Sequence, residues 1–309
     1  MNQIKVFIDG REGTTGLGIF SRLSGREDII VTVLPEETRK SPEARKKAIN
    51  ESDITVLCLP DDAARESVSL VQNPDTVILD ASTAHRTADG WVYGLPELCD
   101  GQAEKIAASK RIAVPGCHAS GFISLVYPLV EQGAISKDAL LCCHSVTGYS
   151  GGGKKMIAQY EADEKEEKLF APRQYGLSQT HKHLPEMAKI TGLHNPPVFC
   201  PIVSDFYSGM LVTVPLFRCQ LENGATVEMV KAIYRKKYDG KMNIEFQENM
   251  SDGGFLDSNT LSGTDKMQIG VFGNEERILL TARYDNLGKG ASGAAVQCLD
   301  LVINKMKNE

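Results

Sequence analysis

The sequence predicts an α/β protein with two domains. We expect a Rossmann-type, doubly wound parallel sheet domain, followed by an α+β catalytic domain whose sheet is mainly antiparallel. Three observations predict this fold class: short apolar runs alternate with longer polar stretches in the first third, a glycine-rich turn follows the first run, and longer strand-like segments follow Cys117. The length of 309 residues is sufficient for two such domains.

The apolar runs of the first third are continuous, which is typical of strands buried on both faces of a parallel sheet. We expect strands over 4–9, 29–34, 54–60, 76–82 and 111–116, and helices between them over 17–23, 41–50, 61–71 and 101–109. This alternation of strand and helix predicts a doubly wound parallel sheet.

The pattern changes after Cys117. A helix candidate follows the cysteine, and strand-like segments then cover 139–148, parts of 195–219, 267–273 and 277–285. The last stretch, KGASGAAVQCLDLVINKMKN, is an amphipathic helix. We therefore predict a dinucleotide-binding domain over 1–116, completed by the C-terminal helix 287–309, and a catalytic and oligomerisation domain over 117–286.

The composition excludes several classes of protein. The hydrophobic content of 42% and charged content of 24% are those of an ordinary globular protein, and the net charge of −6 argues against nucleic acid as a partner. No apolar run approaches the roughly 20 residues that span a bilayer, and the N-terminus does not read as a signal peptide. The eight cysteines form no CxxC pair, which favours a reducing cytoplasm over a zinc site or a disulfide framework.

A glycine-rich turn, IDGREGTTGLG, follows the first predicted strand. Gly10, Gly13 and Gly16 would let phosphate oxygens approach backbone N–H groups at a helix N-terminus, and Thr14 and Thr15 add hydroxyl donors. The spacing GxxGxxG differs from the usual GxGxxG, and a tight turn without a ligand is the alternative.

The end of the second predicted strand, LPEETRK, leaves the type of dinucleotide open. Glu36 or Glu37 could bind a ribose hydroxyl, whereas Arg39 and Lys40 could bind a 2′-phosphate.

Cys117 is the candidate nucleophile. It ends a predicted strand and begins a helix, where the helix dipole and the free N–H groups favour a thiolate and could also form part of an oxyanion site. Gly116 would let a substrate approach. Cys142, Cys143 and Cys298 lie within predicted strands or helices and are interpreted as packing residues, and a structural role is the alternative for Cys117 as well.

A thiolate nucleophile needs a proton-transfer partner. His181 and His183 occur together in THKHLPE, near Glu186, whereas the side chain of His118 would point about 100° away from that of Cys117 on a helix. The H-x-H pair could bind a metal, but no third ligand is evident, so we predict no metal site.

Two further clusters are polar. Ser82 and Arg86, in DASTAHR, follow the fourth predicted strand and should lie at the same carboxyl edge as Cys117. Arg86 could bind a phosphate or carboxylate, or be a solvated loop residue. The glycine-rich loop SVTGYSGGGKK (145–155) could close over a cofactor, or be a flexible linker.

These motifs, taken together and in this order, resemble a known enzyme family. The matching stretches are GREGTTG (10–16), YGLPEL (93–98), PGCHASG (115–121), GYSGGGKK (148–155), THKHLPE (180–186) and DNLGKGASGAAVQ (285–297). They resemble the short form of the N-acetyl-γ-glutamyl-phosphate reductase family, which is related to the aspartate-semialdehyde dehydrogenases. The long form usually carries Tyr-Pro-Thr after the cysteine, and the His-Ala-Ser found here leaves the roles of residues 118–120 open.

The resemblance implies an activity and a site. The activity is NADPH-dependent reduction of N-acetyl-γ-glutamyl phosphate to N-acetylglutamate 5-semialdehyde, with release of phosphate, through a Cys117 thioester in arginine biosynthesis. His181 would be catalytic, and Arg86, Tyr175 and His183 would bind the small-molecule substrate. The cofactor-binding residues would be Gly10, Gly13, Thr14, Thr15, Gly16, Ser82, Gly151, Gly152 and Asn286. A cytoplasmic homo-oligomer is expected.

Alternatives remain at this point. Within enzymes they are a sister acyl-phosphate reductase of lysine biosynthesis, an aspartate-semialdehyde dehydrogenase, and a hydrolase or acyltransferase that uses Cys117 and His181 without a dinucleotide. Outside enzymes, the alternative is a redox-sensing, dinucleotide-binding regulator.

Overall fold

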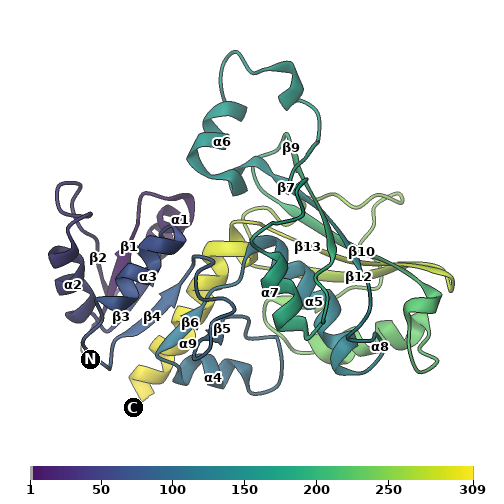
Figure 1. The fold of residues 1–309 in the computed structure, drawn as a ribbon, viewed down its shortest axis with the longest axis horizontal. Coiled ribbons are helices and arrows are strands. Elements are labelled where there is room, and N and C mark those ends of the chain that lie inside the picture. The colour runs from purple at the N-terminus through teal and green to yellow at the C-terminus, as the bar shows by residue number, and fades with distance from the viewer. Residues whose placement is uncertain (1–2, 309) are drawn as a thin grey trace. The chain divides into compact units, whose positions relative to one another are not determined.

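The computed structural model describes residues 3–308, and the chain divides into two compact units (Figure 1). One unit comprises residues 1–116 together with 291–309, and the other comprises residues 117–290. Each unit is built on its own sheet.

The sheet of the first unit has the strand order β2-β1-β3-β4-β6-β5, and every neighbouring pair is parallel. Its strands are β1 (Ile4–Asp9), β2 (Ile29–Thr32), β3 (Ile54–Leu57), β4 (Val77–Asp80), β5 (Val92–Tyr93) and β6 (Arg111–Ala113). The predicted Rossmann-type class is confirmed. The sequence did not predict β5, because two residues are too few to form a recognisable apolar run.

The helices of this unit are α1 (Thr14–Leu23), α2 (Pro42–Asn50), α3 (Asp61–Ser69), α4 (Gln102–Ala108) and α9 (Gly293–Asn308). Helix α2 begins where expected because the Ser41 hydroxyl accepts from the Ala44 N–H and a proline follows at the first helical position. Helix α1 begins three residues before the predicted 17–23, because the N–H of Leu17 already donates to Gly13 O.

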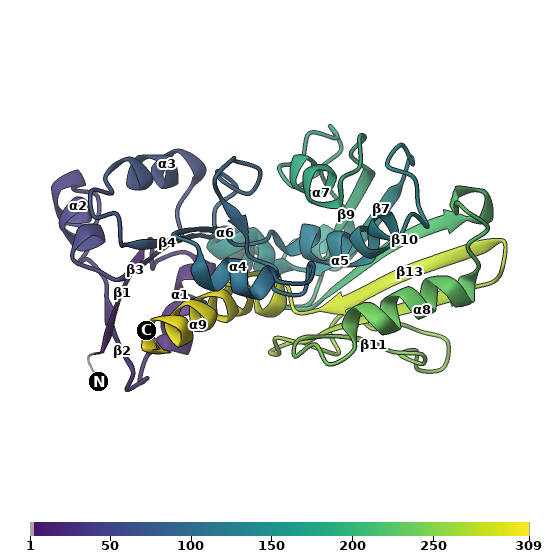
Figure 2. The same ribbon diagram turned by 90° about the horizontal axis from the view of Figure 1, so that it is seen from below.

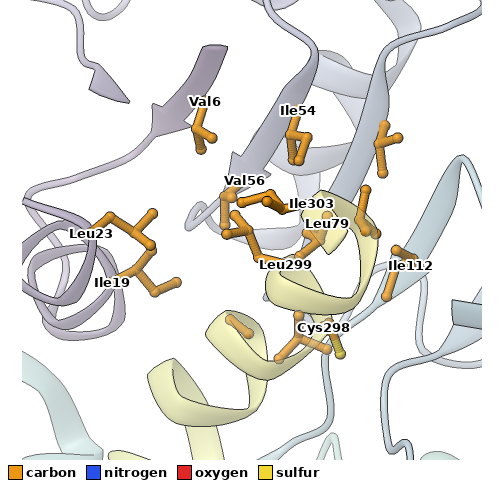
Figure 3. Packing of buried hydrophobic residues seen from close by; sticks show 14 of the residues in the cluster. Val6, Ile19, Leu23, Ile54, Val56, Leu79, Ile112, Cys298, Leu299 and Ile303 are labelled. Atoms are coloured by element: carbon orange, nitrogen blue, oxygen red, sulfur yellow. The ribbon is translucent and has the colours of Figure 1, made fainter. Parts of the chain in front are cut away.

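The C-terminal helix completes the core of the first unit. Leu299 and Ile303 of α9 pack against aliphatic side chains from the parallel strands, including Val56 and Leu79 (Figure 3). Helix α9 also contacts α1 and α4. The C-terminal helix α9 therefore supplies part of the hydrophobic core that covers the parallel sheet of residues 1–116.

The second sheet has the order β11-β12-β13-β10-β7-β9-β8. Its strands are β7 (Cys142–Gly148), β8 (Arg173–Gln174), β9 (Val198–Ser204), β10 (Met210–Phe217), β11 (Ile244–Phe246), β12 (Met267–Gly273) and β13 (Arg277–Tyr284). The pairs β7–β9 and β11–β12 are parallel and the other neighbours are antiparallel, which confirms a mainly antiparallel sheet.

The helices of the second unit are α5 (Cys117–Glu131), α6 (Gly153–Tyr160), α7 (Leu184–Thr191) and α8 (Val227–Tyr238). Helix α5 packs against β10, β13, α7 and α8, and α8 packs beside β11 (Figure 2). The buried hydroxyls of Tyr234 and Tyr238 each donate to a carbonyl of α5, at Leu125 and Ser124, over 2.6 Å. Helices α5 and α8 are thereby joined by hydrogen bonds as well as by apolar contact.

The other face of this sheet presents exposed and half-exposed side chains, because successive residues of a strand point to opposite faces. Cys143 is fully buried, as predicted for a packing residue, and so is Cys298 in α9. The same prediction is wrong for Cys142, which is exposed because it occupies the alternate position on β7.

Within residues 3–308, no helix is sufficiently long and apolar to cross a membrane.

We expect Leu299→Ala to lower the free energy of unfolding of the first unit by about 2–5 kcal/mol, because it leaves a cavity between α9 and the parallel sheet. Trp91 is the one tryptophan of the chain and lies in this unit, so urea unfolding followed by its fluorescence measures the effect. Leu301→Ala, at a half-buried position of α9, is the matched control and should cost less than half as much. Equal losses would contradict the assignment of Leu299 to the core.

Candidate active site

Cys117 is the first residue of α5, and its surroundings fix the start of this helix. The buried Tyr284 hydroxyl donates to Cys117 O at 2.5 Å and accepts from the Gly121 N–H at 3.0 Å. These are the two groups that an α-helical turn would join to each other. Gly290 lies against the cysteine, because a Cβ at that position would be 3.0 Å from the Cys117 Cβ.

Three histidines and a tyrosine gather beside the start of α5. The ring centroids of His118 and His181 are 6.0 Å apart, those of His118 and His183 are 5.5 Å apart, and those of His181 and His183 are 4.8 Å apart. The Tyr175 ring lies 6.2 Å from His118 and 6.1 Å from His181. The structure thus brings together three side chains that were predicted from the sequence, around a fourth that was not.

His118 is the buried centre of this group. Its Nδ1 lies 2.6 Å from Ser145 Oγ on β7, and its Nε2 lies 2.7 Å from the Tyr175 hydroxyl. Phe199 of β9 packs against the ring edge to face at 5.2 Å. Burial, and to a smaller extent His181, lowers the pKa of His118 to about 3, so the imidazole is neutral at physiological pH.

His181 is half-buried, and the backbone N–H of His183 donates to its Nδ1 at 3.3 Å. Burial and the neighbouring Lys182 lower the pKa of His181 below its ordinary value of 6.5. Burial, and then the nearby Cys117, raises the pKa of Tyr175, which keeps its phenol protonated. The site therefore combines a neutral imidazole and a neutral phenol with the thiol of Cys117.

Asn286 holds the glycine-rich loop after β7. Its buried carboxamide accepts from the Gly209 N–H at 2.8 Å and donates to Ser150 Oγ at 3.0 Å. Gly152 is tightly packed in this loop, since a Cβ there would be 2.4 Å from Met156, whereas a Cβ on Gly151 would make an ordinary contact with Asn286 Nδ2 at 3.4 Å. Asn286 thus positions the loop through its own side chain, which the sequence did not indicate.

The glycine-rich turn after β1 requires at least two of its glycines. Gly10 has a φ of +88°, and a Cβ there would lie 2.4 Å from Cys58 O; a Cβ on Gly16 would lie 2.5 Å from Gly10 O. The buried Thr14 hydroxyl has no hydrogen-bond partner within residues 3–308. An unpaired buried hydroxyl at the N-terminus of α1 fits a bound phosphate.

A cavity of about 330 Å³ adjoins this turn. Gly10, Arg11, Arg39 and Lys40 are among its lining residues. Glu36 is not, and it accepts from Arg39 Nη2 at 2.6 Å. The two side chains that the 36–40 segment contributes to the lining are therefore basic, which favours a phosphate as their ligand, whereas Glu12 and Glu66 make other parts of the lining acidic.

A buried ion pair also lines the cavity. Arg45 Nε donates to Asp9 Oδ2 at 3.0 Å, and Ser67 Oγ donates to the same oxygen at 2.8 Å. Arg45 Nη1 reaches Glu66 at 2.7 Å. These bonds compensate the charge of Asp9 at the end of β1, where a ligand would lie.

Ser82 is held by the carboxylate at the end of β4. Asp80 is fully buried and accepts from both the N–H and the hydroxyl of Ser82 at 2.8 Å, and His85 Nδ1 lies 2.6 Å from it. The His85 ring stacks on Trp91 with centroids 4.1 Å apart. The loop after β4 is therefore rigidly positioned.

Arg86 follows in the same loop. The alternative of a solvated loop arginine is wrong, because Arg86 is only 9% exposed. Its Nε donates to Val114 O at 2.9 Å, and its Nη2 donates to Ala81 O at 3.2 Å. The guanidinium is thus fixed to carbonyls beyond the ends of two neighbouring strands.

Sequence reasoning missed Ser145, Tyr284 and the contribution of Arg11 to the cavity. Tyr284 directly precedes the DNLGKG motif, which was the available signal for it. Ser145 begins the stretch 145–155 that was interpreted as a loop, but its first four residues belong to β7. Within residues 3–308, no group of three His, Cys, Asp or Glu side chains could hold a metal ion.

Comparisons with known proteins agree with this geometry. Residues 10–107 match the family model described as "Semialdehyde dehydrogenase, NAD binding domain", and residues 117–286 match "Semialdehyde dehydrogenase, dimerisation domain". The chain is 45% identical to N-acetyl-gamma-glutamyl-phosphate reductase 2 of Nostoc sp., over 98% of each protein. It is 44% identical to N-acetyl-gamma-glutamyl-phosphate reductase 2 of Pseudomonas putida, over 98% of this chain and 97% of the relative.

A solved structure shares the fold. Aspartate semialdehyde dehydrogenase II from Vibrio cholerae superposes with a TM-score of 0.73 over 98% of this chain and 99% of its own, at 16% identity.

Proposed function

This chain belongs to the semialdehyde dehydrogenase family, and we propose that it performs, with Cys117 as nucleophile, the reaction for which its full-length relatives are named. That reaction is the NADPH-dependent reduction of N-acetyl-γ-glutamyl phosphate to N-acetylglutamate 5-semialdehyde, with release of phosphate, in arginine biosynthesis. The observation that carries this proposal is the start of α5, where Cys117 lies beside the histidine cluster in a chain 45% identical to such a reductase.

Cys117 begins the reaction. As a thiolate, it attacks the γ-acyl carbon; the C–S bond forms, and the bond from that carbon to the phosphate oxygen breaks, with its electron pair leaving on phosphate. The N-terminus of α5 favours the thiolate and supplies N–H groups near the developing oxyanion. The product of this step is a thioester on Cys117.

His181 transfers protons at this centre. The bond from the His183 N–H to His181 Nδ1 places the ring hydrogen of the neutral imidazole on Nε2. In the last step the departing thiolate takes a proton from the imidazolium that His181 became when it accepted the thiol proton, and the ring returns to its neutral form. Acceptance of the thiol proton at the start requires the ring to release that bond, which at 3.3 Å is weak.

The first unit fits NADPH, which supplies hydride to the thioester carbon when it is bound. The turn of Gly10, Gly13 and Gly16, with the hydroxyls of Thr14 and Thr15, would hold the pyrophosphate. Ser82, Gly151, Gly152 and the loop clamp Asn286 are the further residues that we assign to this cofactor. The basic wall of the cavity, Arg39 and Lys40, would hold the 2′-phosphate.

Arg86, Tyr175 and His183 are the residues we assign to the substrate. Arg86 would attract the leaving phosphate through its positive charge, because its bonds to Val114 O and Ala81 O hold the guanidinium in a fixed position. Tyr175 and His183 lie in the histidine cluster, against His118, the residue that directly follows Cys117.

The alternatives differ in substrate or in the use of a dinucleotide. The resemblance to aspartate semialdehyde dehydrogenase structures, at 16% identity, concerns the fold alone. A related acyl-phosphate reductase of lysine biosynthesis differs in the shape of the acyl pocket. A hydrolase would leave the glycine-rich turn and its adjoining cavity without a ligand.

We propose that the enzyme is a homo-oligomer, with a second copy on the exposed face of the second sheet. Val146 of β7 pairs with Leu211 of β10 on one side and with Ile202 of β9 on the other, and all three are only half-buried. Phe217 and Leu279 extend this apolar face towards β13. The family model over these residues is described as a dimerisation domain, which supports a second copy as the occupant.

We expect Cys117→Ser to abolish phosphate-dependent reduction of NADP⁺ with N-acetylglutamate semialdehyde, since the weaker hydroxyl nucleophile forms no thioester. His181→Ala should lower turnover by about 100- to 10,000-fold at neutral pH. Because the pKa of His181 is lowered, its neutral form persists below pH 6.5, and the acidic limb of the wild-type kcat/KM profile should lie below that value. Exposed Cys219→Ser is the control.

Full activity of Cys117→Ser would refute the thioester route. Parallel assays with N-acetylglutamyl, N-acetyl-aminoadipyl and aspartyl phosphates test the substrate, and we expect the highest kcat/KM with the first.

We expect the double variant Arg39→Gln/Lys40→Gln to lower kcat/KM for NADPH by about 10- to 1,000-fold, because two charged donors to the 2′-phosphate are lost. The value for NADH should change less than about twofold, since NADH lacks that phosphate. Lys47→Gln, an exposed lysine of α2 outside the cavity, is the control. Equal losses with both cofactors would contradict the assignment.

We expect Val146→Glu to dissociate the oligomer, because it places a charge at the centre of the apolar face. Light scattering should give a multiple of 33.7 kDa for the wild type and about 33.7 kDa for the variant. Met242→Glu, at a position 78% exposed beyond the end of α8, should leave the mass unchanged. An unchanged mass for Val146→Glu would place the interface elsewhere.

A further inference from the structure

His118 contacts the hydroxyl groups of Ser145 and Tyr175, and the reaction scheme above gives these two contacts no role. Its two ring nitrogens contact Ser145 Oγ and the Tyr175 hydroxyl at 2.6 and 2.7 Å, in a site where both His118 and Ser145 are buried. His181, His183 and Phe199 surround the ring. The ring is therefore held in one orientation by contacts on several sides.

A neutral imidazole has one N–H and one lone pair, so it donates to one of the two hydroxyls and accepts from the other. Burial lowers the pKa of His118 to about 3, which makes the neutral ring the relevant form at working pH. The hydrogen bonds of Ser145 and Tyr175 must then run in the same direction along the chain of three groups.

The surroundings of Ser145 determine in which direction these hydrogen bonds run. Throughout the described part of the chain, the His118 ring is the only hydrogen-bond partner of its hydroxyl, which lies on a fully buried residue of β7. If His118 donated to Ser145, the hydroxyl hydrogen would be buried without an acceptor, which costs about 1–3 kcal/mol. Ser145 therefore donates to Nδ1, and the imidazole hydrogen is on Nε2.

This tautomer of His118 determines the direction of the Tyr175 phenol hydrogen. Nε2–H donates to the phenol oxygen, so the phenol hydrogen is directed away from His118. No other described side chain or carbonyl accepts it. The Tyr175 hydroxyl lies against His118, the residue that directly follows Cys117 on α5.

We propose that His118 is a positioning residue, which fixes the Tyr175 hydroxyl as a hydrogen-bond donor to the oxygen of the acyl group carried by Cys117. The inference rests on the proposed function for the identity of that acyl group. The donor stabilises the negative charge that develops on this oxygen when the thiolate adds and again when hydride adds. His118 itself exchanges no proton during the reaction, and Ser145 sets its tautomer.

The tautomer can be measured without any assay of activity. In ¹⁵N-histidine-labelled wild-type protein, we expect Nε2 of His118 to be protonated and Nδ1 unprotonated between pH 5 and 9, with the signals assigned by their loss in His118→Gln. Ser145→Ala removes the donor to Nδ1 and should allow the other tautomer to appear. A wild-type ring protonated at Nδ1, or one that titrates in this range, would overturn the proposal.

Two substitutions of His118 separate the loss of its hydrogen bond to Tyr175 from the loss of its side-chain volume. The amide nitrogen of His118→Gln can take the place of Nε2 and donate to Tyr175, whereas the shorter His118→Asn reaches only Ser145. We expect kcat to fall about 100-fold in His118→Asn and in Tyr175→Phe, with KM changed less than about threefold, and to recover to within about fivefold of wild type in His118→Gln. The pH profile of His118→Gln should keep the wild-type shape.

The double variant His118→Asn/Tyr175→Phe should be no slower than Tyr175→Phe, because both changes remove the same donor. Additive losses, or a His118→Gln as slow as His118→Asn, would refute the proposal. A wild-type protein inactive on every acyl phosphate would instead refute the proposed function, while the ¹⁵N result would still report the tautomer of His118.

Discussion

The insertion of the Tyr284 hydroxyl into the first turn of α5 is the contact on which the site depends. It holds the carbonyl of Cys117 and the N–H of Gly121 at once, and its own residue is fully buried at the end of β13. The cysteine is therefore positioned by the sheet as well as by its own helix. A nucleophile that must meet an acyl carbon in a defined geometry needs such fixed backbone atoms.

The close packing of Gly290 against Cys117 further restricts the position of the cysteine. Gly290 lies against Cys117, and any side chain at this position would displace the cysteine or the turn that contains Gly290. Tyr284 directly precedes the DNLGKG motif and Gly290 is its last residue, so the two ends of this stretch both contact Cys117. Tyr284 contacts Cys117 through a hydrogen bond and Gly290 contacts it through close packing, and both contacts act on the first turn of α5.

Much of the framework follows from local pattern. The continuous apolar runs gave the parallel strands within a few residues, and the cysteine before an apolar helix was recognisable as the start of α5. The contacts within the site were not recognisable, because Ser145 and Tyr175 lie 27 and 57 residues from His118, and Tyr284 lies 167 residues from Cys117. Pairings over such distances depend on the order of strands in the sheet, which no local pattern specifies.

The role of His118 illustrates the limit of helical geometry as an argument. Successive side chains on a helix diverge by about 100°, and on this ground the sequence analysis set His118 apart from Cys117. The same rotation carries the ring into the space between β7 and the segment before α7, where it meets Ser145 and the histidine pair. The angle between His118 and Cys117 therefore did not predict that His118 would contact Ser145 and the two other histidines.

The late position of α9 in the chain has a consequence for synthesis on the ribosome. Residues 1–116 contain all six parallel strands, yet Leu299 and Ile303 of their core are translated only after the whole of 117–290. The nascent sheet must therefore wait with part of its apolar surface in water while the second unit emerges and folds. During that interval the exposed apolar surface of the unfinished sheet is prone to aggregation.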